Sequence, residues 1–131
     1  MTKIAKTTPD STKIKSVDDF YNFLKGIITK YSSVFTICFN DLQVPQSLYY
    51  WDKEPLENDG SFVFFNLTDN NKNPYCNLYI VDLIKEIEDS LINRQAFLFF
   101  HLEGSDILYY VNPNYIVDEK YGRITMHVTS Y

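Results

Sequence analysis

Two histidines, His101 and His127, are the residues best suited to acid–base chemistry in this chain. Imidazole titrates near neutral pH, so it can both accept and donate a proton in catalysis. Both histidines fall in apolar, strand-like segments, and Tyr110 and Thr125 would share their face of a sheet. An isolated histidine on such a face is more often hydrogen-bonded and structural, so the acid–base pair is kept as an alternative.

The chain lacks the residue spacings that mark metal sites and activated nucleophiles. Its two cysteines, Cys38 and Cys76, lie far apart, and no Cys-x-x-Cys, His-x-x-x-His or calcium-loop pattern occurs. No Gly-x-Ser-x-Gly motif occurs either, and only four glycines are present, with no phosphate-binding loop among them. Glu103 and Asp106 face each other across a predicted turn, where solvated like charges interact weakly. We therefore expect no metal, no cofactor and no enzymatic activity.

The stretch most suggestive of binding is Tyr49–Asp59, in which aromatic residues are followed by acidic ones. Tyrosine and tryptophan give large contact areas at a low entropic cost, and acidic groups around them favour a basic partner. Alternatively, the aromatic residues fill the core and the acidic loop only keeps the protein in solution. The candidate binding residues in this stretch are Tyr49, Tyr50, Trp51, Asp52, Glu54, Glu57 and Asp59.

A second candidate surface comes from a hairpin predicted over Ala96–Asn112. Gly104-Ser105 is a two-residue turn signal between apolar runs, and it places Leu102 opposite Ile107. One face of the hairpin is then wholly apolar, and the other is partly polar. Because the aromatic residues of the second face are too apolar to stay exposed, a helix, a second copy or a partner is expected to cover them. The candidate residues there are Phe97, Phe99, His101 and Tyr110.

Hydrophobic periodicity predicts the elements that position these residues. Ser16 and Asp19 form a capping-box-like start, and apolar residues at helical spacing continue to Tyr31. Gly26 inside this helix suggests a close approach to the sheet. Strands are predicted over residues 34–39, 47–51 and 61–68. A second helix is predicted up to residue 91, and it either follows a strand over residues 75–81 or starts directly with Asn73 as its N-cap.

The predicted fold class is α+β, with an antiparallel sheet of about five strands and two helices packed mainly on one face. Pro113-Asn114 is taken as a two-residue turn, and a last hairpin places Glu119 opposite Arg123. Four consecutive strands would then form one antiparallel meander. Because such a sheet has one apolar face, the helices are expected to cover that face.

Composition limits the classes of function. The 131 residues fit one domain, 16–131, preceded by a flexible basic arm, 1–15. The net charge is −5; the arm carries +3, so the remainder carries −8. An acidic body argues against tight, sequence-independent binding of nucleic acid, and no apolar run is long enough to span a membrane. The aromatic fraction of 17% exceeds what a small core needs, and a binding surface and AT-rich codon usage are the two alternative explanations for the excess.

These features favour a non-enzymatic, acidic, cytosolic protein-binding module. In this interpretation the chain is a small inhibitor or immunity-type protein of a bacterium, phage or mobile element, and it blocks a positively charged partner. One alternative is a self-associating structural or accessory subunit that buries the mixed face in a homo-oligomer. Others are an enzyme or ligand-binding domain using the two histidines, and nucleic-acid binding through the lysine arm.

Overall fold

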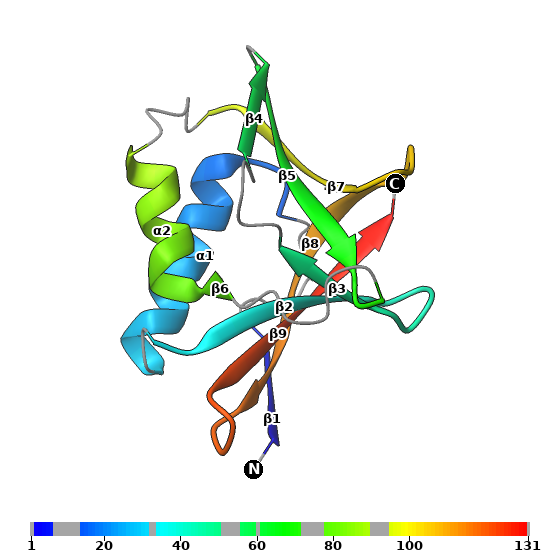
Figure 1. The fold of residues 1–131 in the computed structure, drawn as a ribbon. Coiled ribbons are helices and arrows are strands. Elements are labelled where there is room, and N and C mark those ends of the chain that lie inside the picture. The colour runs from blue at the N-terminus through cyan, green and yellow to red at the C-terminus, as the bar shows by residue number, and fades with distance from the viewer. Residues whose placement is uncertain are drawn as a thin grey trace.

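The computed structural model describes residues 2–6, 14–31, 34–50, 56–59, 61–71, 78–89 and 95–130. Two helices lie side by side against one sheet (Figure 1). They are α1 (Val17–Lys30) and α2 (Ile80–Asp89). The strands are β1 (Thr2–Lys6), β2 (Thr36–Asp41), β3 (Ser47–Tyr50), β4 (Leu56–Asp59), β5 (Phe62–Asp69), β6 (Leu78–Tyr79), β7 (Phe97–Leu102), β8 (Leu108–Asp118) and β9 (Arg123–Ser130).

The sheet is mixed. Its nine described strands include a continuous path in the order β1-β8-β7-β5-β3-β2-β6, while β4 pairs with β5 and β9 pairs with both β2 and β8. Two neighbouring pairs, β2 with β9 and β5 with β7, are parallel. The prediction of about five antiparallel strands is therefore wrong. The chain returns from β5 to β7 through α2, and a crossover helix brings the second strand back parallel to the first.

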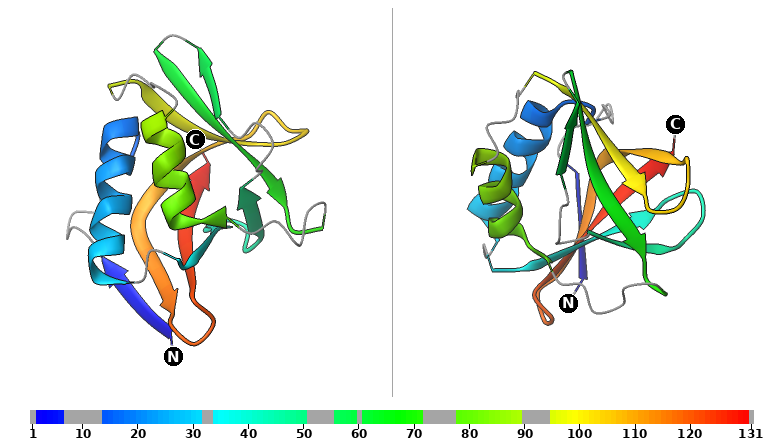
Figure 2. Two further views of the ribbon diagram at one scale, coloured as in Figure 1. Left: turned by 60° about the vertical axis from the view of Figure 1, so that its left-hand side comes forward. Right: turned by 45° about the horizontal axis from the view of Figure 1, so that its top comes forward.

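The strand pairings close on themselves. Among the described strands, β2 pairs with β3, β3 with β5, β5 with β7, β7 with β8, β8 with β9, and β9 again with β2. The short strands β1, β4 and β6 extend the sheet where neighbouring members of this ring diverge. Strand twist produces this curvature, and both helices lie on the same side of the curved sheet (Figure 2).

Helix α1 confirms the predicted start at Ser16. The Ser16 hydroxyl accepts a hydrogen bond from the Asp19 backbone N–H at 3.1 Å, which satisfies one of the free donors of the first turn. The buried residues of its apolar face are Val17, Phe20, Phe23, Leu24 and Ile27. The close approach predicted at Gly26 is wrong, because this residue is exposed and a Cβ added to it would meet nothing within 4 Å.

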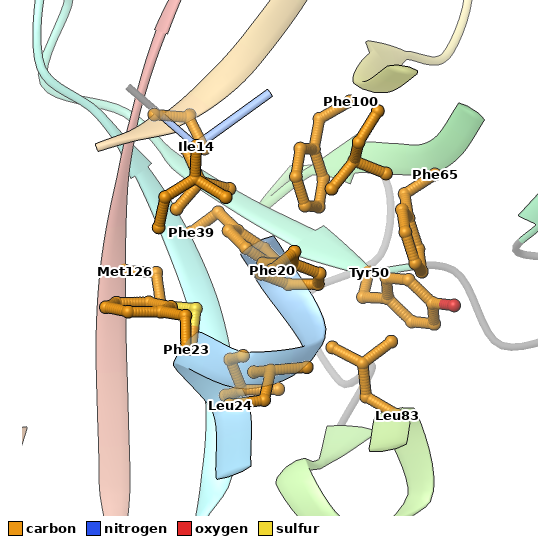
Figure 3. Close-up of a cluster of buried hydrophobic side chains, with 14 of the residues drawn as sticks. Ile14, Phe20, Phe23, Leu24, Phe39, Tyr50, Phe65, Leu83, Phe100 and Met126 are labelled. Carbon is orange, nitrogen blue, oxygen red and sulfur yellow. The ribbon is translucent and has the colours of Figure 1, made fainter. Parts of the chain in front are cut away.

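Phe20 of α1 lies among the buried side chains at the centre of the core (Figure 3). Its ring meets Phe65 of β5 at 5.7 Å and Phe100 of β7 at 5.4 Å between centroids, both edge-on. Phe39 of β2 lies 4.8 Å from Phe100, and Tyr50 of β3 lies 5.4 Å from Phe65. Aromatic residues from one helix and four strands therefore hold the helix layer to the sheet.

Strand β8 runs straight through the segment predicted as a turn. Asn112 Oδ1 accepts hydrogen bonds from the Asn114 backbone N–H at 3.1 Å and from its side-chain amide at 2.6 Å. The pairing with β9 is irregular between Val111 and Tyr115, where Pro113 has no N–H to contribute. The predicted turn at Pro113-Asn114 is wrong, because the irregularity accommodates the proline inside one long strand. The predicted four-strand meander is wrong for the same reason, since two of its strands are the two halves of β8.

The last hairpin is shifted by one residue from its predicted register. Asp118, rather than Glu119, pairs with Arg123, so Tyr115 and Val117 face the core at 1% and 0% exposure. The β7–β8 hairpin, in contrast, has the predicted register, with Phe100 opposite Tyr109. Gly104 in its turn has a φ of 74°, which suits a residue without a Cβ.

The segment predicted as a flexible basic arm contains β1, whose backbone pairs antiparallel with the second half of β8. Ile14, near the end of the same segment, is buried and forms a backbone bridge to Val111. Neither described helix is long and apolar enough to cross a membrane.

Candidate functional site

The outer face of the parallel pair β5–β7 carries four stacked phenylalanines, Phe62, Phe64, Phe97 and Phe99, which we call the phenylalanine ladder. The register pairs Phe62 with Phe97 and Phe64 with Phe99. Phe62 stacks on Phe97 and on Phe99 at 5.9 Å between centroids in each case, and Phe64 stacks on Phe99 at 5.7 Å. The rings therefore support one another in one nearly parallel array.

Strand alternation places the ladder on the face opposite to the core. Phe65 and Phe100, which follow Phe64 and Phe99 in the sequence, are fully buried against α1. Because consecutive residues of a strand point to opposite faces, Phe64 and Phe99 point away from the helices. Phe62 remains 41% exposed and Phe97 remains 55% exposed. The sequence predicts that something must cover this face; in the described part of the chain, neither helix covers these two rings.

Two predicted acidic residues lie on the strand next to the ladder. In the antiparallel β4–β5 pair, Asp59 is opposite Phe62 and Glu57 is opposite Phe64. The structure thus brings together, by backbone register, two stretches that are far apart in sequence: the acidic segment after Trp51 and the aromatic hairpin.

On the other side of the ladder, Ser16 forms a backbone bridge to Phe97, the Leu98 N–H donates to the Lys15 carbonyl oxygen, and β8 pairs with β7 further along, at Phe100 and His101. Tyr110 is buried, and the ammonium group of Lys15 lies 5.5 Å from the centre of its ring, within the range of a cation–π contact. His101 follows Phe99 along β7, and its Nε2 is 2.6 Å from the backbone oxygen of Ser105. This contact ties the imidazole to the hairpin turn, which is a structural role.

The remaining predicted binding residues are distributed between core and surface. Tyr50 is buried in the core, whereas Tyr49 is half-buried on the outer face of β3. Trp51, Asp52 and Glu54 lie outside the described residues. Tyr49 and Tyr50 therefore do not share one surface, because consecutive residues of β3 point to opposite faces of the sheet.

The two histidines are not neighbours. His101 is opposite Leu108 at the start of β8, whereas His127 of β9 lies beside the irregularity between Val111 and Tyr115. Burial lowers the pKa of His127, and in the described part of the chain its Nδ1 has no hydrogen-bond partner. An acid–base pair built from both histidines does not form.

Other reactive groups are also dispersed. Burial raises the pKa of the Cys38 thiol, whose Sγ lies 3.5 Å from Thr125 Oγ1, so the reactive thiolate is disfavoured. Within the described ranges, no group of three or more His, Cys, Asp or Glu side chains is placed to hold a metal ion.

Phe62 and Phe64 are the surface residues that sequence reasoning missed. The signal was present, because Phe-Val-Phe-Phe-Asn-Leu in β5 and Phe-Leu-Phe-Phe-His-Leu in β7 have the same alternating pattern. These segments pair residue for residue from Phe62–Phe97 to Leu67–Leu102. Had the two strands been recognised as parallel neighbours, the ladder would have followed from the sequence.

Comparison with known proteins gives no relative: no family model, no curated protein and no solved structure matches this chain.

Proposed function

We propose that this protein is a non-enzymatic, cytosolic protein-binding module whose interface is centred on the phenylalanine ladder. The observation that carries the proposal is the exposure of Phe62 and Phe97, which stack on a rigid sheet at 5.9 Å. Phenylalanine brings a large apolar area with few rotatable bonds, so a preformed array loses little entropy on binding. In this role the chain acts as an inhibitor or immunity-type protein that blocks its partner sterically.

The size of the ladder indicates what else the interface needs. A stable interface buries about 800 Å² on each partner, and one aromatic side chain contributes only about 150–250 Å² when fully buried. Four partly exposed rings therefore supply an apolar centre, and neighbouring residues must supply the rim. The backbone register places Glu57 and Asp59 of β4 beside Phe64 and Phe62 of β5, so β4 is the candidate for an acidic part of that rim.

Charge favours a basic protein over the alternatives. A second copy of this chain would bring the same acidic residues near its own ladder, in a protein of net charge −5. Exposed aromatic rings can also stack on the bases of single-stranded nucleic acid, but that mode needs a positively charged groove for the phosphates. A partner with an apolar patch surrounded by lysine or arginine fits both the ladder and its acidic neighbours.

The test is capture of interacting proteins by the tagged wild-type chain and by a Phe62→Ser/Phe97→Ser double variant. We expect the wild type to retain a basic protein at low salt, less of it at moderate salt, and the double variant to retain none. Tyr121→Ser is the matched control, because Tyr121 is 69% exposed in the β8–β9 turn, away from the ladder. Binding of the purified partner to the three proteins is then compared directly.

The acidic rim has its own test. Glu57→Gln/Asp59→Asn should weaken binding of the same partner and reduce its dependence on salt, whereas Glu119→Gln in the β8–β9 turn should do neither. The proposal fails if capture is unaffected by the ladder substitutions. It also fails if light scattering shows a salt-insensitive dimer that the double variant converts to monomer, since self-association would then be the function of this face.

A further inference from the structure

An open cleft of about 840 Å³ lies at one end of the sheet, where β2 ends and the β7–β8 turn approaches the end of β9. It is separate from the phenylalanine ladder, since no ladder residue lines it. Its volume is within the range of small-molecule sites, roughly 300–1,000 Å³. The lining residues on which the argument depends are Asp41, Gln43, Val44, Asp106, Ile107 and Ser130.

The Asp41 carboxylate lies in the wall of the cleft and is only 6% exposed. Its Oδ1 accepts hydrogen bonds from the backbone N–H groups of Gln43 at 2.9 Å and Val44 at 3.3 Å. Its Oδ2 accepts one from the Tyr109 hydroxyl at 3.1 Å. All of these donors are neutral, and no lysine, arginine or histidine is among the described residues that line the cleft. A buried carboxylate is stabilised most by a cation, so its surroundings favour a positively charged ligand.

Two exposed hydrophobic side chains also line the cleft. Val44 is 60% exposed and Ile107 is 43% exposed, although both are large hydrophobic side chains. One lies in the segment after β2 and the other in the segment before β8. Apolar groups at this position can contact an aliphatic chain whose charged end reaches the carboxylate. This observation is independent of the charge of Asp41, and it selects against a bare inorganic cation.

Hydrogen-bond acceptors are also available for more than one N–H of a ligand. The Ser130 hydroxyl donates to Gln43 Oε1 at 2.6 Å, so its own oxygen can still accept. Asp106, exposed at the rim, adds a second carboxylate. An ammonium group has three donors and no acceptor, so it matches a lining rich in carboxylate and hydroxyl oxygens.

We propose that this cleft binds an alkylammonium group, that is, a protonated primary amine at the end of a short aliphatic chain. The amine lies toward Asp41 and Ser130, and the chain lies between Val44 and Ile107. The same chemistry is offered by a free amine and by a lysine side chain of another protein. The inference does not depend on the proposed function of the ladder.

The test is an NMR titration of the isotope-labelled protein with n-butylammonium, followed by an N-acetylated, C-amidated lysine. We expect saturable shifts confined to the amides of residues 41–44, 105–109 and 130, with affinity falling about tenfold in Asp106→Asn, equivalent to about 1.4 kcal/mol. Asp89→Asn, which removes the same charge at the end of α2, should leave the affinity unchanged. A blocked lysine that binds at least as well as the free amine identifies a side chain as the natural ligand; preference for n-butylammonium identifies a free amine.

Asp41→Asn is a second variant, and its spectrum first shows whether it remains folded. A folded Asp41→Asn should lose most of the affinity, because the amide retains hydrogen bonding but not charge. The proposal is overturned if shifts do not saturate, if they spread evenly over the acidic surface, or if Asp106→Asn and Asp89→Asn behave alike. n-Butanol, which keeps the chain and lacks the charge, should not bind. Ladder variants such as Phe97→Ser should bind n-butylammonium normally, so failure here and failure of the ladder proposal remain distinguishable.

Discussion

The Tyr109 hydroxyl donates a hydrogen bond to Asp41 Oδ2 over 3.1 Å, so the start of β8 is linked to the end of β2 across 68 positions of sequence. Neither strand pairs directly with the other, because β9 lies between them. The bond therefore connects two strands across one end of the closed ring. Both side chains are buried, at 2% and 6% exposure, and both residues belong to the lining of the cleft described above.

Replacing Tyr109 by phenylalanine is expected to lower the free energy of unfolding by about 1–3 kcal/mol, because a buried carboxylate oxygen loses its donor while the ring packing is kept. Chemical denaturation at pH 7 measures this loss. Tyr121→Phe, at an exposed tyrosine, is the control and should change stability by less than about 0.5 kcal/mol. Equal stability of the two variants would show that water replaces the Tyr109 hydroxyl.

The hydrogen-bonded pair of Tyr109 and Asp41 predicts that the stability of the protein decreases at alkaline pH. Burial, and then the charge and hydrogen bond of Asp41, raise the pKa of Tyr109 to about 12. The unfolded chain releases this proton near pH 10, whereas the folded protein holds it, so the folded state binds more protons above pH 10. This contribution to stability is complete below pH 10 and declines as the pH rises toward 12. Unfolding free energies measured from pH 9 to 11.5 should decline less steeply in Tyr109→Phe than in the wild type.

The lowered pKa of His127 predicts that the stability of the protein decreases as the pH falls below neutrality. This pKa is lowered by burial, so the unfolded state binds a proton more readily than the folded state. Stability should therefore be retained above pH 6.5 and should fall as the pH drops below that value. His127→Leu removes the titrating group, and denaturation between pH 5.5 and 7.5 should then show a smaller decline than in the wild type. An unchanged decline would assign the acid sensitivity to carboxylates.

Truncation of an aromatic ring should lower stability much more on the inner side of the β5–β7 pair, where Phe20 of α1 packs, than on its outer face, which carries Phe97. Phe20→Ala removes a fully buried ring that meets Phe65 and Phe100, and it should cost about 3–5 kcal/mol. Phe97→Ala removes a ring that is 55% exposed, and it should cost less than about 1 kcal/mol. Thermal or urea unfolding checks both variants. A large loss in Phe97→Ala would mean that the ladder stabilises the fold rather than serving as a binding surface.

Two glycines should respond with opposite signs to alanine. Gly122 has a φ of +60°, and a Cβ would lie 3.4 Å from Phe35 Cδ1, so Gly122→Ala should destabilise the protein by about 1–2 kcal/mol. Gly26 is an exposed helical residue with free space around it, so Gly26→Ala should stabilise the protein by about 0.5–1 kcal/mol. Urea unfolding of both variants measures the two changes. A decrease in stability for Gly26→Ala would contradict the open surroundings of that residue.

Local patterns in the sequence were sufficient where neighbouring residues determine the structure. The Ser16 hydroxyl and the Asp19 N–H lie three residues apart, so the start of α1 followed from capping chemistry alone. The register of the β7–β8 hairpin followed from its tight Gly104-Ser105 turn, since a short loop leaves few alternative pairings. The aromatic, partly polar outer face of β7 followed from strand alternation.

Tertiary structure decided which distant strands became neighbours. Nothing local indicates that β5 pairs parallel with β7 through α2, and this pairing is what assembles Phe62, Phe64, Phe97 and Phe99 into a ladder. The pairing of β4 with β5 likewise converted a predicted acidic loop into a strand beside those rings. The partnership of Asp41 with Tyr109 depends on the closure of the sheet through β9. Sequence patterns report which residues share a face, but the pairing of remote strands depends on the packing of the whole core, which only the folded chain provides.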